Sequence, residues 1–267
     1  MECLYHDNMP DIKLASSRRG TGSPLVVIRQ LDREGWAPVI DLLAHEREVV
    51  AVDLPGFGDS PPLPGTRPTV QALATEVALW FSKVGLTRPP VVGNSLGGAV
   101  ALELARAGVV ASAVAVSPIG LWTGPGAAYA LGSLRFARTM AHSLGPRTAR
   151  LTRSPLGRTL AFWQLAARPW QMTAEAADGA LRNLVRSSGF EATRRAARTY
   201  RLTGFTPSVP VTVAWGTRDL LTPRHQAHRA AQLLPTACHV RLRGCGHSPM
   251  SDDPGRIARL LLSTSTG

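Results

Sequence analysis

Short runs of apolar, mostly β-branched residues recur along the chain, and longer stretches with helical spacing separate them. The runs are PLVVI (24–28), EVVAVDL (48–54), PPVVGN (89–94), ASAVAVS (111–117), VPVTVAW (209–215) and CHVRLRG (238–244). Continuous apolar runs of this length are typical of strands that are buried on both faces of a parallel sheet. We therefore predict that these runs form one central, mostly parallel sheet.

The stretches between the runs carry apolar residues at the spacing of one helix face. They cover residues 69–85, 96–108, 222–235 and 254–263. Alternation of strands and helices predicts the α/β class, with helices flanking the sheet.

This alternation stops between about Ile119 and Phe205, where no convincing strand occurs. Arginine-rich amphipathic stretches, separated by proline and glycine, occupy 134–145, 157–167 and 188–204. We predict a helical lid at residues 119–205, inserted between two strands. Residues 1–118 and 206–267 are then the core domain.

Composition narrows the class of protein. A chain of 267 residues is long enough for one large α/β domain, and 44% hydrophobic residues with a mean hydropathy near zero are typical of a soluble globular protein. No run approaches the roughly 18 apolar residues that a membrane span needs. The N-terminus has no apolar signal region, and Cys3, Cys238 and Cys245 form no disulfide or metal pattern, so we expect a cytoplasmic protein.

The net charge of +12 is concentrated in one region. Residues 120–205 hold 13 arginines against three carboxylates, those of Glu175, Asp178 and Glu191. Such a region fits an anionic substrate, an acidic carrier protein or a merely solvated face. Nucleic acid is disfavoured because zinc-ligand spacing, aromatic strand motifs and helix-turn-helix patterns are absent. We expect a small-molecule substrate, anionic or carrier-bound among the options, and neither a nucleic-acid nor a membrane partner.

The stretch VVGNSLGGAVALELA (91–105) combines a strand, a sharp turn and a helix. Small residues on both sides of Ser95 allow the tight turn of a nucleophile elbow, which exposes the serine hydroxyl at the helix N-terminus. The pattern predicts Ser95 as a nucleophile.

A serine nucleophile needs a base, and the base needs an orienting carboxylate. Asp219 follows one predicted strand in AWGTRDLLTP, and His247 follows the next in RLRGCGHSPMSDDP. The order Ser95, Asp219, His247 is that of an α/β-hydrolase triad. The other histidines lie in predicted helices, termini or strands. Asp252 and Asp253 are expected to cap the last helix, and Asp53 to anchor a turn.

The blocks DLPGFGDSP, GNSLGG, AWGTRD and GCGHSP resemble those of the α/β-hydrolase superfamily, in its lid-bearing bacterial esterase and haloperoxidase-like branch. The similarity spans residues 20–265 and is weakest in the lid. It implies an enzyme without a cofactor or metal, with its active site between sheet and lid. It also implies triad roles for Ser95, His247 and Asp219.

One loop departs from that resemblance. Where the family usually has His-Gly after the first apolar strand, this chain has Arg29-Gln30. The oxyanion donors are expected to be the N–H groups of Leu96 and Leu31. Alternatively, the side chain of Gln30 or Arg29 replaces a donor or blocks the pocket. Arg29 could also bind a substrate carboxylate or phosphate, or could simply face outward.

The leading functional hypothesis is a hydrolase of carboxylic esters, thioesters or lactones that acts through an acyl-enzyme on Ser95. Candidate pocket walls are Trp122, Phe136, Trp163 and Trp170. Within the class, one alternative is a C–C bond hydrolase, because an asparagine beside the nucleophile, here Asn94, also occurs in that branch. The other is a biosynthetic thioesterase or cyclase, which would explain a basic lid. From another class, the altered loop suggests a non-hydrolytic catalyst or a small-molecule binding protein.

Overall fold

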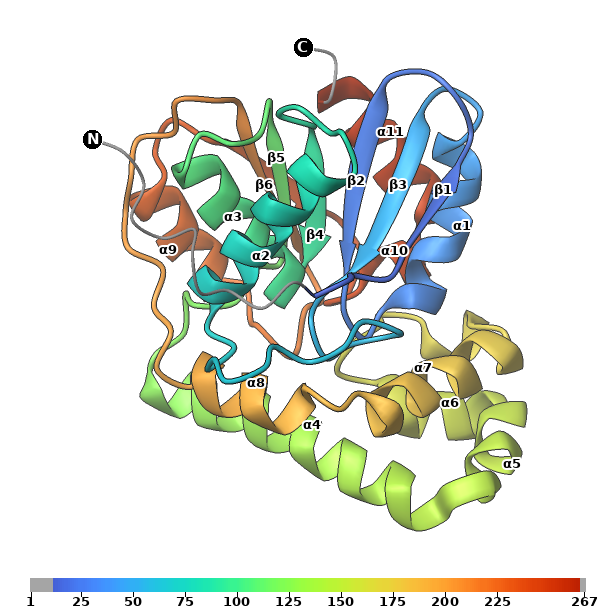
Figure 1. The fold of residues 1–267 in the computed structure, drawn as a ribbon. Coiled ribbons are helices and arrows are strands. Elements are labelled where there is room, and N and C mark those ends of the chain that lie inside the picture. Colours follow the sequence, from blue (N-terminus) through green and yellow to red (C-terminus); the bar gives the residue numbers. More distant parts are fainter. Residues whose placement is uncertain (1–11, 265–267) are drawn as a thin grey trace.

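The computed structural model describes residues 12–264 (Figure 1). Cys3 and His6 lie outside these residues. The same holds for residues 1–11 of the N-terminal segment, for which no signal region was expected.

A seven-stranded sheet forms the centre of the molecule, with the strand order β1-β3-β2-β4-β5-β6-β7. The strands are β1 (Ser16–Arg19), β2 (Pro24–Arg29), β3 (Glu48–Asp53), β4 (Val91–Asn94), β5 (Ala113–Val116), β6 (Val211–Gly216) and β7 (Cys238–Leu242). Only the pairing of β1 with β3 is antiparallel. The predicted α/β class and the mostly parallel sheet are confirmed.

Helices cover both faces of the sheet, and alternate residues of each strand separate the two cores. Val26 and Ile28 of β2 face a cluster that includes α2 (Val70–Lys83), α3 (Leu96–Arg106) and α9 (His225–Leu233). Leu25 and Val27 face the opposite cluster, with α1 (Arg33–Leu43) and α11 (Pro254–Thr264). The period-two alternation of a strand thus buries apolar residues on both sides.

Three elements of the core were not predicted: β1, α1 and the short helix α10 (Pro249–Asp252), which buries Met250. β1 has the sequence SSRR, and all four residues are exposed, so an edge strand formed here without an apolar signal. α1 follows the loop at Arg29-Gln30. It contains Pro38, yet its buried side chains Trp36, Val39, Ile40 and Leu43 pack against the sheet. Tertiary packing therefore offsets the proline.

A helical insertion lies between β5 and β6, as predicted, and forms the lower layer of the molecule in Figure 1. It comprises α4 (Gly124–Leu144), η1 (Gly145–Arg147), α5 (Thr148–Arg153), α6 (Pro155–Phe162), η2 (Pro169–Gln171), α7 (Ala174–Arg186) and α8 (Phe190–Ala197). Thr123, Ser154 and Thr173 each accept a hydrogen bond from the backbone N–H three residues later, which fixes the starts of α4, α6 and α7.

None of the helices within residues 12–264 is both long and apolar enough to cross a lipid bilayer.

Candidate active site

Ser95 lies at the sharp turn between β4 and α3, with φ 55° and ψ −112°. Such a conformation is unfavourable for a residue with a side chain, and the surrounding backbone must hold it in place. A Cβ atom on Gly93 would lie 2.3 Å from the carbonyl oxygen of Gly97, and one on Gly97 would lie 2.7 Å from that of Ile28. Glycine is therefore required at position 93 for β4 to approach α3, and at position 97 for α3 to pack against β2.

Asp219 and His247 come together at the same edge of the sheet, on the loops that follow β6 and β7. His247 Nδ1 lies 2.9 Å from Asp219 Oδ2, and both side chains are buried. Asp219 Oδ1 also accepts hydrogen bonds from the N–H groups of Leu221 (3.0 Å) and Thr222 (2.7 Å). This arrangement holds the carboxylate in one orientation beside the imidazole ring.

Thr222 is part of the same network, although it was not among the predicted site residues. Its hydroxyl donates to Asp219 Oδ2 at 2.7 Å and lies 3.0 Å from His247 Nδ1. With Thr222 donating to the carboxylate, the Nδ1 proton of His247 also points to Asp219, and Nε2 is left free to act as a base. The only available signal was a threonine three residues after the aspartate.

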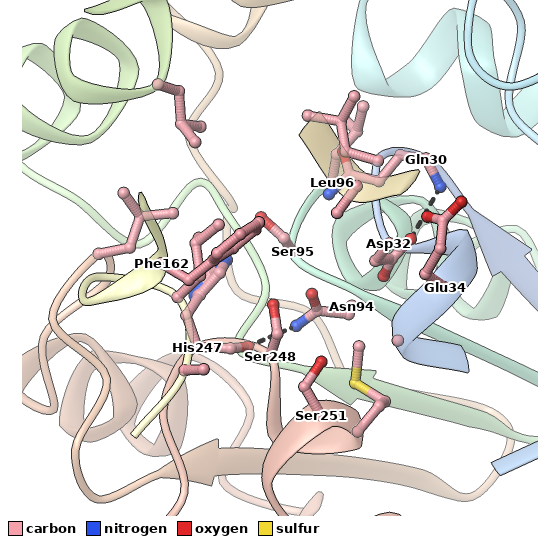
Figure 2. A pocket seen from close by; sticks show the side chains of 18 of the residues that line it. Gln30, Asp32, Glu34, Asn94, Ser95, Leu96, Phe162, His247, Ser248 and Ser251 are labelled. Atoms are coloured by element: carbon pink, nitrogen blue, oxygen red, sulfur yellow. Dashed lines mark hydrogen bonds between the residues drawn. The ribbon is translucent and has the colours of Figure 1, made fainter. Parts of the chain in front are cut away.

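Asn94, the residue before Ser95, fixes the loop that carries His247. Its Nδ2 donates to the carbonyl oxygens of His247 (2.9 Å) and Val116 (3.1 Å). Figure 2 shows this bond next to Ser95, with Ser95 and His247 bordering the same pocket. A buried amide with two backbone acceptors thus positions the histidine loop relative to the elbow.

Asp32 shapes the loop after β2, in which Arg29-Gln30 stands where the resemblance leads one to expect His-Gly. Its carboxylate accepts hydrogen bonds from Gln30 N–H (3.0 Å) and from the indole N–H of the buried Trp36 (2.8 Å). Burial raises the pKa of the Asp32 carboxyl to about 6. The hydrogen bond turns Gln30 N–H toward Asp32, so the loop has a fixed conformation without glycine.

Leu31 and Leu96 both line the pocket beside Ser95. Leu96 is the first residue of α3, where backbone N–H groups have no acceptor within the helix. In the part of the chain that the structure describes, the N–H groups of Leu31 and Leu96 have no hydrogen-bond partner. Their assignment as oxyanion donors stays a prediction.

Arg29 does not occupy the position expected of a substrate-binding residue. It is the last residue of β2 and pairs in register with Asp53 of β3. Its Nε lies 2.9 Å from Asp53 Oδ1, its side chain is buried, and burial lowers the pKa of its guanidinium. Arg29 neither lines the pocket nor faces outward, because the neighbouring strand supplies its counter-ion. Asp53, expected to anchor a turn, also accepts from the N–H of Asp59 at 3.3 Å.

The aromatic residues suggested as pocket walls also lie elsewhere. Trp122 is buried in the core cluster and does not line the pocket. Phe136, Trp163 and Trp170 are exposed on the insertion. Helical periodicity could not tell which face of each insertion helix turns toward the sheet.

The pocket itself has a volume of about 320 Å³ and lies between the sheet edge and the insertion. Its apolar lining comes from Phe57, Ile119, Leu131, Leu134, Phe162, Leu165, Phe190 and Leu221, among others. Gln30, Asp32 and Glu34 lie on one side of Ser95, and Phe162 and His247 lie on the other (Figure 2).

Arg194 is the one arginine in the lining, and it is not a free cation. It donates to both oxygens of Glu191, at 2.9 and 2.6 Å, and this hydrogen bonding lowers the pKa of Glu191 to about 2. Asp32 and Glu34 add carboxylates to the lining. The pocket therefore offers no unpaired positive charge to an anionic group.

Asp253 caps α11 as expected, because its Oδ1 accepts from Arg256 N–H at 3.0 Å. Asp252 does not share that role. Its carboxylate accepts from Gly246 N–H (2.7 Å) and from the N–H groups of Ala167 (2.9 Å) and Arg168 (3.0 Å). It therefore connects the residue before His247 to the insertion.

Two other kinds of site, a metal centre and a reactive cysteine, find little support in the described residues. Within 12–264, no group of three or more histidine, cysteine or acidic residues is arranged to hold a metal ion. Burial raises the pKa of the Cys245 thiol to about 11, so a thiolate does not form there near neutral pH. The combination of Ser95 with the Asp219–His247 pair is suited to nucleophilic attack by an activated hydroxyl.

Comparisons with known proteins agree with this chemistry at the level of family. Residues 20–260 match the alpha/beta hydrolase family. Epoxide hydrolase EphH of Mycobacterium tuberculosis is 30% identical over 204 residues, which cover 72% of this chain and 92% of that protein. An uncharacterized protein of the same organism, Rv2715, is 28% identical over 262 residues, covering 89% of this chain and 74% of the relative.

Solved structures have the same fold. A thermophilic esterase from Thermogutta terrifontis superposes with a TM-score of 0.72 at 24% sequence identity, covering 94% of this chain and 92% of the esterase.

Proposed function

The chain belongs to the alpha/beta hydrolase family, and on that premise we propose that it is a serine hydrolase of the lid-bearing, esterase-like branch. It cleaves a carboxylic ester, thioester or lactone through an acyl-enzyme on Ser95. The observation that carries this proposal is the Asp219–His247 hydrogen bond beside the pocket that exposes Ser95.

In the acylation step, His247 Nε2 takes the proton of the Ser95 hydroxyl while the oxygen attacks the substrate carbonyl carbon. The imidazolium that forms is stabilised by Asp219, whose second oxygen is held by two backbone N–H groups. The bond to the leaving alcohol or thiol then breaks, and His247 returns the proton to the leaving group. Ser95 is left as an ester of the acyl group.

In the deacylation step, His247 takes a proton from water, which attacks the acyl-enzyme. The carboxylic acid leaves, and the proton returns to Ser95. In both steps the negative charge on the carbonyl oxygen develops next to the N–H groups of Leu96 and Leu31, which we propose as its donors.

The proposed acyl group is apolar and uncharged. The mostly apolar lining favours such a chain by removing it from water. A substrate carboxylate would meet Asp32 and Glu34 and no unpaired arginine, since Arg29 is paired with Asp53 and Arg194 with Glu191. The basic charge of the insertion thus does not extend into the pocket as an anion site.

Epoxide opening, named for one relative, fits Ser95 poorly. An alkoxide that opened an epoxide would leave an ether on Ser95, which water activated by histidine does not cleave. A carboxylate nucleophile would leave an ester, which water can hydrolyse. Acyl transfer is the reaction that returns Ser95 to its starting state.

The remaining alternatives lack a specific observation in their favour. Asn94, which suggested C–C bond hydrolysis, uses its amide N–H groups on backbone carbonyls. The buried network of Asp219, Thr222 and His247 supports a proton-transfer role over a pure binding protein.

The proposal is tested by intact-mass analysis after exposure to a fluorophosphonate. We expect one label per wild-type chain, no label on Ser95→Ala, and unchanged labelling of Ser251→Ala, a matched variant of another pocket serine. Loss of Ser95 should reduce ester hydrolysis on the order of 10⁶-fold. A well-folded wild type that resists labelling would refute the proposed nucleophile.

A series of p-nitrophenyl esters tests the acyl preference. Neutral alkyl esters should give kcat/KM values at least about tenfold higher than an ester of equal length that ends in a carboxylate, a difference of about 1.4 kcal/mol. Equal values for both would contradict the apolar acyl site and leave the nucleophile untouched.

A further inference from the structure

Exposed apolar side chains are concentrated in one segment of the molecule. Of the nine large hydrophobic residues that are exposed within 12–264, seven lie between α4 and η2. Besides Tyr129, they are Phe136, Met140, Leu156, Leu160, Trp163 and Trp170. Exposed apolar side chains that are concentrated in one segment in this way are typical of interaction sites.

The spacing of these residues forms two stripes. Leu156 and Leu160 of α6 and its C-cap residue Trp163 follow one another at intervals of four and three residues. This spacing places them on one helix face, and they are 69%, 64% and 50% exposed. On α4, Phe136 and Met140 are four residues apart and also exposed. Both helices therefore turn an apolar stripe toward solvent.

One hydrogen bond connects α4 to the end of α6, and another connects α6 to η2. Gln164, next to Trp163, donates from Nε2 to the hydroxyl of Tyr129 on α4 at 2.8 Å. Arg158 of α6 donates to the carbonyl oxygen of Trp170 at 2.9 Å. In Figure 1, α4, α5 and α6 belong to the lower layer of the molecule, below the sheet. We call the exposed surface of α4, α5, α6 and η2 the insertion face.

The charge of the insertion face has one sign. The sequence contains no acidic residue between Glu103 and Glu175. Arg135, Arg147, Arg150 and Arg153 are exposed, and within the described chain their guanidinium groups form no hydrogen bond or ion pair. Arg147 and Arg150 border a shallow surface hollow.

We propose that the insertion face binds the surface of an anionic lipid bilayer. Unpaired arginines attract acidic headgroups, and exposed aromatic and aliphatic side chains enter the boundary between headgroups and acyl chains. The apolar residues stand on convex helices, and a bilayer requires no complementary shape. The absence of a membrane-spanning run was the reason for expecting no membrane partner. Binding to the surface of a bilayer needs no such run.

The position of the face relative to the pocket supports this assignment. Leu131 and Leu134 of α4 and Phe162 of α6 line the pocket, whereas Phe136 and Leu160 on the same helices are exposed. A bilayer on the insertion face thus lies against the helices that border the pocket. The binding itself does not depend on the proposed hydrolysis.

Tryptophan fluorescence provides a direct readout of this contact. Trp36, Trp80, Trp122 and Trp215 are buried, whereas the two exposed tryptophans, Trp163 and Trp170, both belong to the insertion face. Vesicles of equal parts phosphatidylcholine and phosphatidylglycerol should shift the emission to shorter wavelength and sediment the protein. Vesicles of phosphatidylcholine alone should bind far less. Ser95→Ala should bind as wild type does, so that a failed function and a failed inference are distinguishable.

Variants separate the contributions of charge and apolar contact. Replacing the four arginines by Gln should weaken binding on the order of 100-fold or more. The double variant Leu160→Ser with Trp163→Ser should also lose binding, while Leu42→Ser, an exposed leucine on α1, should not. Trp163→Phe with Trp170→Phe should keep sedimentation and lose the spectral shift.

Several results would overturn the proposal. One is that the wild-type protein does not sediment with phosphatidylglycerol vesicles at low salt. Another is that the wild-type protein sediments with them but its tryptophan emission does not shift. Binding of polyglutamate with equal affinity by wild type and by the Leu160→Ser, Trp163→Ser variant would instead indicate an acidic protein partner. Concentration-dependent dimerisation that buries Trp163 without lipid would indicate a second copy of the chain.

Discussion

Ser95, Asp32 and Arg29 illustrate how single residues depart from their ordinary roles near the pocket. Ser95 has a positive φ, and Gly93 and Gly97 on either side of it leave room for the sharp turn. Asp32 holds the loop in which a glycine was expected, because its carboxylate accepts the N–H of Gln30. Arg29 forms an ion pair with Asp53 of the neighbouring strand. The altered loop is thus compatible with a working oxyanion site, because its conformation is held by side-chain hydrogen bonds.

The raised pKa of Asp32 predicts a specific dependence of stability on pH. Its carboxyl titrates near 6 in the folded protein, against 3.8 for the unperturbed group. Between these values the folded state binds more protons than the unfolded state, so this group's contribution to stability falls as pH rises through the window and is constant above it. Asp32→Asn should remove that contribution.

Urea unfolding of wild type and Asp32→Asn across the range from about pH 4 to about pH 8 measures this effect. The stability advantage of wild type over the variant should be largest at the acidic end and should shrink until about pH 6. Asp41→Asn, an exposed aspartate on the same helix, is the control. A difference that grew with pH would mean that the ionised form is the favoured one.

At the scale of elements, apolar runs predicted β2 to β6 because burial on both faces leaves a continuous apolar signal, and apolar periodicity predicted most core helices. Apolar patterning also predicted β7, although only Leu242 of this strand is fully buried. It missed β1, whose exposed residues contribute only backbone hydrogen bonds, and α1, whose proline and charged start resemble a loop. It also missed α7, which is strongly amphipathic but rich in polar residues.

The sequence located Ser95, Asp219 and His247 because sharp turns after strands have local patterns. It could not locate Thr222, Asn94 or the roles of Asp32 and Asp252. Those roles consist of contacts to backbone groups that are distant in sequence, as in the bond from Asn94 to His247. The misplacement of Trp122 has the same origin, since the rotation of a segment about its axis is set by its neighbours.

The contact of α3 with β2 yields a prediction at this scale. Gly97→Ala places a methyl group 2.7 Å from the carbonyl oxygen of Ile28, where neither backbone can move freely. We expect a loss of about 1–3 kcal/mol in the free energy of unfolding and slower fluorophosphonate labelling.

Gly132→Ala is the matched control, because nothing lies within 4 Å of the added methyl group on the exposed side of α4. It should be neutral or stabilising by up to about 1 kcal/mol. Equal stability of the Gly97 variant and wild type in urea unfolding would show that the elbow tolerates a wider separation from β2.

At the scale of the whole molecule, the insertion is attached to the core near the histidine. Asp252 accepts from Gly246, Ala167 and Arg168, and Ser248 N–H donates to the carbonyl oxygen of Leu165 at 2.7 Å. On the other side of the pocket, Asn183 of α7 donates to both oxygens of Glu34 on α1. The pocket is therefore bordered by contacts between core and insertion.

Asp252→Ala should weaken this attachment. Three backbone N–H groups lose their acceptor, so we expect a loss of about 3 kcal/mol in stability. Hydrogen exchange should accelerate at residues 167, 168 and 246, and kcat should fall more than KM rises because Gly246 precedes His247.

Exchange measured by mass spectrometry, together with steady-state kinetics, checks this expectation. Asp253→Asn, which alters the cap of α11 and a partly exposed ion pair with Arg256, should cost about 1 kcal/mol or less and leave kcat unchanged. Unaltered exchange at residue 246 in the Asp252 variant would limit Asp252 to a role within its own loop.

The insertion leaves and re-enters the sheet at β5 and β6, which are neighbouring strands. Its sequence can therefore diverge, or be exchanged for that of another family member, without breaking the ladder of hydrogen bonds on either side. Evolution can in this way alter the lining of the pocket and the insertion face together, in one recombination event. The exchanged segment would have to bring its own hydrogen-bond donors for Asp252 and Glu34, which sets the compatibility rule for natural or engineered chimeras.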